Sequence, residues 1–274
     1  MIKMSKPFLE FIFVLAVAVL IYSFNLGLLG NLFLLSYFAY KVYSMRYFVY
    51  SIKGNKLYSQ RNTEEALKWF KKAAEVRTCR PRVISGYGYL LLREGRVEEA
   101  SKVIGKVLKM NLDPMEKSNT KMTLALIHWK NNDLQGAIDI LEEIYNTYKS
   151  VTLYESLGYL LILTGDYDKA LKFNLEAQDY DSSNNIILDN LGETYYFLGE
   201  KDKAFNIYKD LVEKPITFAE PFYFYGLILS ERDRKEEAKE MFEKALSCRE
   251  SFLSNLNKDK ISQELDKLSN EIND

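Results

Sequence analysis

The sequence predicts an all-α protein, a solenoid of stacked helical pairs, and three observations lead to this fold class. A small residue within a charged run returns every 33 to 37 residues between about Tyr47 and Phe252. Another small residue stands twelve positions before each of these, where two helices would have to approach closely. Residues 255–272 then carry apolar side chains at helical spacing, which is typical of one further helix. A fixed period of this length indicates stacked helical hairpins.

The two sets of small residues define six periods. The recurring alanines and the small residues that precede them are Ala66, Ala100, Ala137, Ala170, Ala204 and Ala238, and Gly54, Gly88, Ala125, Gly158, Gly192 and Gly226. Such an array offers a long concave surface instead of a catalytic pocket, so binding is expected rather than chemistry.

The residues between these markers carry a more specific pattern. In the second period, positions 4, 7, 8, 11, 15, 20 and 24 are Ile84, Tyr87, Gly88, Leu91, Gly95, Ala100 and Ile104. The fourth, fifth and sixth periods agree with it. This pattern resembles the tetratricopeptide repeat, a helix-turn-helix unit with small residues at positions 8, 20 and 27. Gly95, Gly165, Gly199 and Asn132 fall at the turns, where a positive φ ends a helix.

Two periods depart from the pattern. The third has Ala125 in place of the first glycine, His128 at a ring position, and three additional residues near Asp113 and Pro114. The first has Lys53 where an apolar residue belongs. The resemblance implies a right-handed superhelical solenoid of about six repeats with a C-terminal capping helix. The expected parts are units at about 47–80, 81–114, 118–151, 151–184, 185–218 and 219–252, and a cap at 253–274.

An apolar stretch over residues 8–42 precedes the repeats. As one helix it would measure roughly 52 Å, against a bilayer core of about 30 Å, so the chain is expected to turn once. Residues 25–31, with Gly27 and Gly30, are the predicted turn. The first 46 residues are thus predicted to be a membrane anchor, a transmembrane helical hairpin with arms at about 8–24 and 32–45 in contact with the lipid bilayer.

Basic residues flank the predicted hairpin on both sides, with Lys3 and Lys6 before it and Lys41 and Arg46 after it. Because basic flanks stay on the cytoplasmic side, a multi-pass protein of the cell membrane with cytoplasmic repeats is expected. A cleaved signal peptide is the first alternative, although no small-x-small cleavage site follows the first apolar run. A single-span anchor is the second, and it would place the repeats outside the cell.

The charge is distributed unevenly along the chain. Residues 1–56 carry a net charge of +5, which leaves −6 for the remainder of a chain whose total is −1. An acidic repeat domain disfavours nucleic acid as a partner. The abundance of lysine, asparagine, isoleucine and tyrosine favours an AT-rich bacterial genome.

The sequence offers little for catalysis. His128 is the only histidine, and its repeat position favours packing over chemistry. There is no zinc-ligand spacing, phosphate-binding glycine loop or nucleophile elbow. We therefore expect no enzyme, no cofactor, no metal and no catalytic residue.

The resemblance places the binding surface on the first helix of each repeat, at positions 2, 5, 9, 12 and 13. The groove residues expected there are Arg82, Tyr89, Leu92, Arg93, Met122, Trp129, Lys130, Glu155, Tyr159, Ile162, Asp189, Glu193, Tyr196 and Tyr223. Tyrosine, tryptophan, methionine and arginine are typical anchors of interfaces, so a protein or peptide partner is predicted. The alternative is that these rings only complete the packing between repeats.

The expected function is a membrane-anchored adaptor or scaffold whose repeat groove binds a peptide segment of a partner protein. The alternative from another class is a regulator, in which a ligand or peptide in the groove alters a partner enzyme or an envelope assembly. Neither the partner nor the oligomeric state follows from the sequence.

Overall fold

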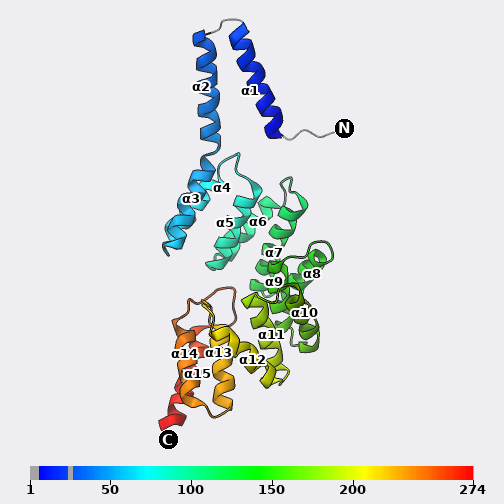
Figure 1. Ribbon diagram of the computed structural model, residues 1–274, viewed down its shortest axis with the longest axis vertical. Helices are drawn as coiled ribbons and strands as arrows, with labels where there is room; N and C mark the ends of the chain where they lie inside the picture. The colour runs from blue at the N-terminus through cyan, green and yellow to red at the C-terminus, as the bar shows by residue number, and fades with distance from the viewer. Residues whose placement is uncertain (1–5, 24–26, 274) are drawn as a thin grey trace. The chain divides into compact units, whose positions relative to one another are not determined.

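The computed structural model describes residues 6–23 and 27–273, and every regular element among them is an α-helix. The chain divides into two compact units, Met1–Val83 and Ile84–Asp274. The helices of the first unit are α1 (Lys6–Ser23), α2 (Gly27–Ser44), α3 (Arg46–Ser59) and α4 (Thr63–Ala74) (Figure 1).

Helices α1 and α2 occupy the apolar N-terminal stretch, but the predicted turn is only partly where it was expected. Residues 25 and 26 of that turn lie outside the described residues, and residues 27–31 belong to α2. Gly30 serves close packing rather than a turn. A Cβ atom added to it would lie 2.2 Å from Cγ2 of Ile21, so only glycine leaves room for that branched side chain.

The predicted membrane spans, residues 8–24 and 32–45, gain no support from these two helices. Within the described ranges, no helix combines the length with the apolar character that a membrane crossing requires.

Helices α3 and α4 form the first helical pair, and they show how the unexpected Lys53 is accommodated. Its ammonium nitrogen lies 3.9 Å from the ring centroid of Trp69, and the ring of Tyr50 lies 5.6 Å from the same ring. A lysine whose charged end rests on an aromatic face can pack its aliphatic stem like an apolar side chain. Lys53 stays exposed and places its charged end on the Trp69 ring.

The second unit continues with antiparallel helical pairs and ends in one additional helix (Figure 1). Its helices are α5 (Pro81–Arg93), α6 (Val97–Val107), α7 (Pro114–Lys130), α8 (Leu134–Tyr145), α9 (Val151–Leu163), α10 (Tyr167–Tyr180), α11 (Asn185–Phe197), α12 (Lys201–Val212), α13 (Glu220–Glu231), α14 (Lys235–Ser247) and α15 (Lys258–Asn273). Helix α5 begins just before the boundary at residue 84. The all-helical solenoid predicted from the sequence is confirmed.

The small residue in each first helix allows its partner helix to come close. A Cβ atom added to Gly88, Gly192 or Gly226 would lie 2.8 Å from the nearest side-chain atom of the second helix. The side chains met are Ile104, Tyr208 and Phe242. Each glycine therefore receives one large side chain of its partner helix, sixteen positions later in the sequence.

The third helical pair, α7 and α8, explains the three additional residues near Asp113 and Pro114. Asp113 caps α7 in a capping box with Glu116, and Pro114 occupies the first turn. These residues favour helix initiation at this place, so the additional residues lengthen α7. The predicted unit 118–151 consequently begins inside this helix.

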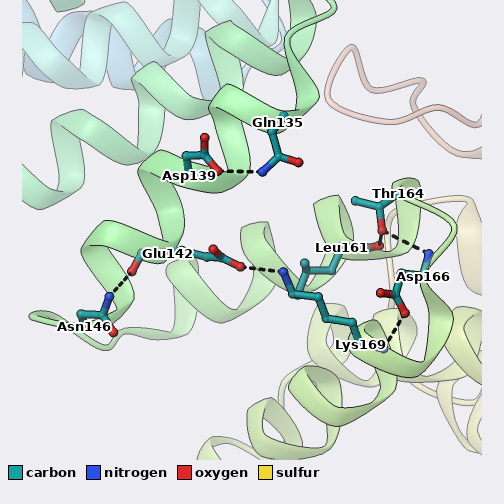
Figure 2. A network of polar contacts seen from close by, with 8 residues as sticks. All are labelled: Gln135, Asp139, Glu142, Asn146, Leu161, Thr164, Asp166 and Lys169. Carbon is teal, nitrogen blue, oxygen red and sulfur yellow. Dashed lines mark hydrogen bonds and ion pairs between the residues drawn. The ribbon is translucent and has the colours of Figure 1, made fainter.

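Polar contacts between the second helices of successive pairs add to the apolar packing (Figure 2). The Nζ atom of Lys169 on α10 lies 2.8 Å from a carboxylate oxygen of Glu142 on α8. Asp166 accepts a hydrogen bond from the backbone N–H of Lys169 and so caps α10. Both side chains of the ion pair are about half exposed, so this contact contributes little beyond alignment.

The chain does not pass directly from α14 into the last helix. Residues 249–257 are non-helical, and α15 begins at Lys258, later than the predicted start of the cap at residue 253. Ile261 and Leu268 of α15 are buried in the cluster around Phe242, which fixes the helix to the end of the array. We call residues 249–257 the return segment.

Candidate functional site

The predicted groove residues lie on the first helices of the pairs, but only some of them can meet a ligand. Arg82 belongs to the first compact unit, and the others belong to the second. Leu92, Met122, Ile162 and Tyr223 are buried, at most 4% exposed, and serve packing between helices. Tyr89 and Arg93 are exposed on α5.

Helices α7 and α9 bring together an aromatic and basic group. The rings of Trp129 and Tyr159 pack edge to face with their centroids 5.5 Å apart. The Nζ atom of Lys130 lies 3.7 Å from the centroid of the Trp129 ring. Burial lowers the pKa of Lys130 to about 8 and raises the pKa of the Tyr159 hydroxyl, so both groups are partly removed from water.

Helix α11 supplies acidic side chains to the same face. Asp189 and Glu193 are 5% and 7% exposed. Burial, and then the neighbouring Glu220, raises the pKa of Glu193 to about 8, whereas Lys260 lowers it. The pKa of Asp189 is raised well above its ordinary value by the same two causes, and its Oδ1 atom has no hydrogen-bond partner. This part of the face carries carboxyl groups whose charge is poorly compensated.

Two other predicted residues are held by contacts between neighbouring pairs. The Tyr196 hydroxyl donates to Glu231 at 3.2 Å, and its ring packs against Phe224 at 5.3 Å. Glu155 accepts a hydrogen bond from the side chain of Asn184 at 2.8 Å. For these residues the structure shows packing and alignment of the repeats.

The return segment lies on this surface. The Tyr159 hydroxyl accepts a hydrogen bond from the backbone N–H of Asn255 at 3.0 Å. Lys130 donates to the backbone carbonyl of Ser254 at 3.4 Å. The aromatic and basic group therefore contacts the peptide backbone of a segment more than ninety positions away in the sequence.

Side chains of the return segment make further contacts with the same helices. Arg249 forms an ion pair with Glu94, with 2.9 Å between Nη2 and Oε1. Phe252 lies beside Gly95, and its ring centroid is 5.0 Å from Nζ of Lys130. Leu253 packs against the apolar cluster of α7 and α9, and the Ser254 hydroxyl donates to Glu220.

Sequence reasoning missed the return segment and its partners Glu94 and Gly95. The available signal was a stretch with Phe252 and Leu253 between two helical patterns, in which the helical period is interrupted. Nothing local reveals where such a stretch folds back, because its partners lie on α5, α7, α9 and α13.

The geometry defines a class: an α-solenoid whose first helices present hydrogen-bond donors, acceptors and aromatic rings. Among the described residues no group of His, Cys, Asp and Glu could hold a metal ion. The arrangement offers contacts with a backbone and with side chains of a ligand segment.

Comparison with known proteins agrees with this class. Residues 122–185, 188–215 and 219–251 each match the tetratricopeptide repeat family. These three stretches are therefore tetratricopeptide repeats, as the sequence pattern predicted. It is 25% identical over 152 residues to TPR repeat-containing protein MJ1428 of Methanocaldococcus jannaschii. That match covers 55% of this chain and 26% of the relative, so the chain spans about a quarter of the relative's length.

Solved structures share the fold. A tetratricopeptide repeat protein from Parabacteroides merdae superposes with a TM-score of 0.65 at 18% identity, covering 82% of this chain and 85% of the other. The APC/C hetero-tetramer Cut9–Hcn1 gives a TM-score of 0.66 at 16% identity, covering 96% of this chain and 50% of the other. Likeness at this identity concerns the fold alone.

Proposed function

We propose that this protein is an adaptor whose groove on α7, α9, α11 and α13 binds an extended peptide segment of a partner protein. One observation carries the proposal: Tyr159 and Lys130 hold backbone atoms of a non-helical segment on this face. Contacts with a backbone suit segments of varied sequence. Tetratricopeptide repeat proteins mediate protein–protein interactions, and an adaptor or scaffold role fits that family.

The experiment compares partner capture by the wild type with capture by the double variant Tyr159→Phe/Lys130→Met. These substitutions remove the hydroxyl and the ammonium group and keep most of the apolar bulk. Trp129 is left unchanged because it is 8% exposed and belongs to the core of the third and fourth pairs. Affinity purification followed by mass spectrometry should find a protein that the wild type retains and the variant loses.

A matched control is Tyr180→Phe/Lys172→Met, which makes the same changes on α10, outside the groove. The control should retain the partner. Equal loss from both variants, or equal retention by both, would contradict binding through the groove.

We further propose that the α1–α2 hairpin attaches the protein to a lipid bilayer. Large apolar side chains are exposed along both helices, among them Leu20, Leu28, Leu35 and Phe38. At the junction of α2 and α3, the guanidinium of Arg46 lies 3.8 Å from the Tyr43 ring centroid. Aromatic and basic side chains together are typical of a membrane interface. That the repeats face the cytoplasm stays a prediction.

Flotation with phosphatidylcholine vesicles tests this attachment. The wild type should float with the vesicles, and Leu35→Asp/Phe38→Asp should remain in the dense fraction because two charges would enter the apolar layer. The control Leu175→Asp/Ile186→Asp places the charges at exposed apolar positions of the repeats and should float. A wild type that stays in the dense fraction would contradict the proposal. If the protein then forms dimers, the exposed apolar side chains of α1 and α2 would be covered by a second copy of the chain.

A further inference from the structure

The return segment has a chemistry of its own, and it occupies the surface on which a partner would bind. We propose that it is a ligand in cis, and that the partner segment shares its chemistry and displaces it. That chemistry is a guanidinium, an aromatic residue three positions later followed by leucine, and then a hydroxyl, as in Arg249, Phe252, Leu253 and Ser254. The inference rests on the proposed groove function and adds the class of partner.

Each end of the segment is fixed by a polar contact with a different helix. Arg249 reaches Glu94 at the end of α5, a carboxylate whose side chain is only 19% exposed. Ser254 donates to Glu220 at the start of α13. The two carboxylates therefore set the direction and length of a bound segment, because each requires its own donor.

The middle of the segment supplies the apolar contacts. Leu253 packs on the cluster that contains Trp129 and Leu160, while Phe252 rests against Gly95 and remains 37% exposed. A Cβ atom added to Gly95 would lie 3.4 Å from Cδ2 of Phe252, so the ring lies in van der Waals reach of this turn. An aromatic residue followed by leucine thus fits the groove at this point.

The segment can leave without the fold being lost. On one side α14 is fixed by buried Met241 and Phe242, and on the other α15 is fixed by Ile261 and Leu268. Because both ends stay anchored, the return segment has a high effective concentration at the groove, on the order of millimolar. A free peptide therefore competes at a disadvantage until the cis contacts are weakened.

The test measures binding of a synthetic peptide with the sequence of residues 247–258 to the full chain. In a Trp69→Phe background, Trp129 is the only tryptophan, so its fluorescence reports the groove. Phe252→Ala/Leu253→Ala should bind the peptide at least tenfold more tightly than the protein with an intact segment, because the groove is then open. Equal affinity for both proteins would overturn the competition in cis.

A second variant covers the case in which the double alanine protein does not fold. Arg249→Glu changes one exposed side chain, repels Glu94 and should also raise the affinity for the peptide. Replacing Glu94 by Arg in the same chain restores the pair in cis and also repels the arginine of the peptide, so the affinity should fall to the original level or below it. If Arg249→Glu has no effect, the ion pair does not hold the segment.

Control peptides separate this inference from the proposed function. A peptide with alanine in place of phenylalanine and leucine should bind at least tenfold more weakly to the opened variants. Failure of the original peptide to bind any folded variant would overturn the inference. The proposed function would still stand if Tyr159→Phe/Lys130→Met lost its partner, and it fails separately if that partner is retained.

Discussion

Two glutamates of the second unit have opposite environments, although each lies on a helix of a tetratricopeptide repeat. Glu176 on α10 accepts hydrogen bonds from the hydroxyls of Tyr145 and Tyr154 and from Lys149, at 2.6 to 2.9 Å. Lys149 and the two tyrosines lower its pKa to about 2. Glu193 on α11 is buried beside Glu220, and its pKa is raised to about 8.

The difference separates a structural contact from a candidate binding surface. Donors around Glu176 stabilise its charge, so this carboxylate joins the third and fourth pairs. The charge of Glu193 is destabilised by burial and by Glu220, and Lys260 compensates it only in part. A protein keeps such a group at a cost in stability, which is common at functional sites.

The largest effect is expected from Glu193→Gln. Because folding raises the pKa of Glu193, its contribution to stability is full below about pH 4.5 and is lost as the pH rises through about 8. The shift from 4.5 to about 8 is about 3.5 pKa units, which at about 1.4 kcal/mol per unit sets an upper limit of about 5 kcal/mol. Relaxation of the site around the ionised carboxylate reduces this limit, and a destabilisation on the order of 2 kcal/mol is expected above pH 8. The variant should therefore melt about 5 °C higher than the wild type at pH 9 and nearly equally at pH 5.

Thermal unfolding by circular dichroism across this pH range measures the effect. Glu243→Gln on α14 makes the same change at an exposed position and should shift the melting temperature little at either pH. If Glu193→Gln shifts the melting temperature equally at pH 5 and pH 9, the pKa of Glu193 is not raised by folding, and the contrast with Glu176 does not hold.

Glu176→Gln should act in the opposite direction. Folding lowers the pKa of Glu176, so its contribution is present above about pH 4.5 and is lost as the pH falls toward 2. Because its side chain is 43% exposed, solvent screens the ion pair, and a loss of about 1 kcal/mol at pH 7 is expected. Urea unfolding at pH 7 and at pH 3 should show the loss shrinking at the lower pH, and a loss of equal size at both would contradict it.

The smallest effect is expected from Lys260→Gln. Lys260 lowers the pKa of Glu193, so its removal should raise that pKa further and extend the loss of stability to higher pH, above about 8. A change of a few tenths of a kcal/mol is expected. In the Glu193→Gln background the same substitution should have no pH-dependent effect, which a double-mutant cycle measures. A pH-dependent effect that persists there would show that Lys260 acts through another group.

Much of the fold could be predicted because the contacts within each repeat join residues that are close in the sequence. Gly88 and Ile104, or Gly192 and Tyr208, lie in one helical pair, so their contact follows from a spacing of sixteen residues. The positive φ of Gly95, Gly165, Gly199 and Asn132 was likewise predicted from local turn chemistry and is observed. Gly30 was misassigned because a glycine can mark either a turn or a close approach.

The candidate site was predictable only in part. Trp129, Lys130 and Tyr159 were predicted as groove residues, and the structure brings them together at the return segment. Leu92, Met122 and Ile162 satisfy the same position rule but are buried, and Met122 and Ile162 belong to the apolar cluster of the third and fourth pairs. Position within a repeat does not fix how far neighbouring pairs rotate.

The sequence by itself determined the helical pairs, their order and the close approach within each pair, since these depend on side chains fewer than about forty residues apart. Only the tertiary structure decided that residues 249–257 lie against α5, α7 and α9, and that Glu193 faces Glu220. Contacts across several repeats depend on the accumulated rotation of the array, and no local pattern encodes that rotation.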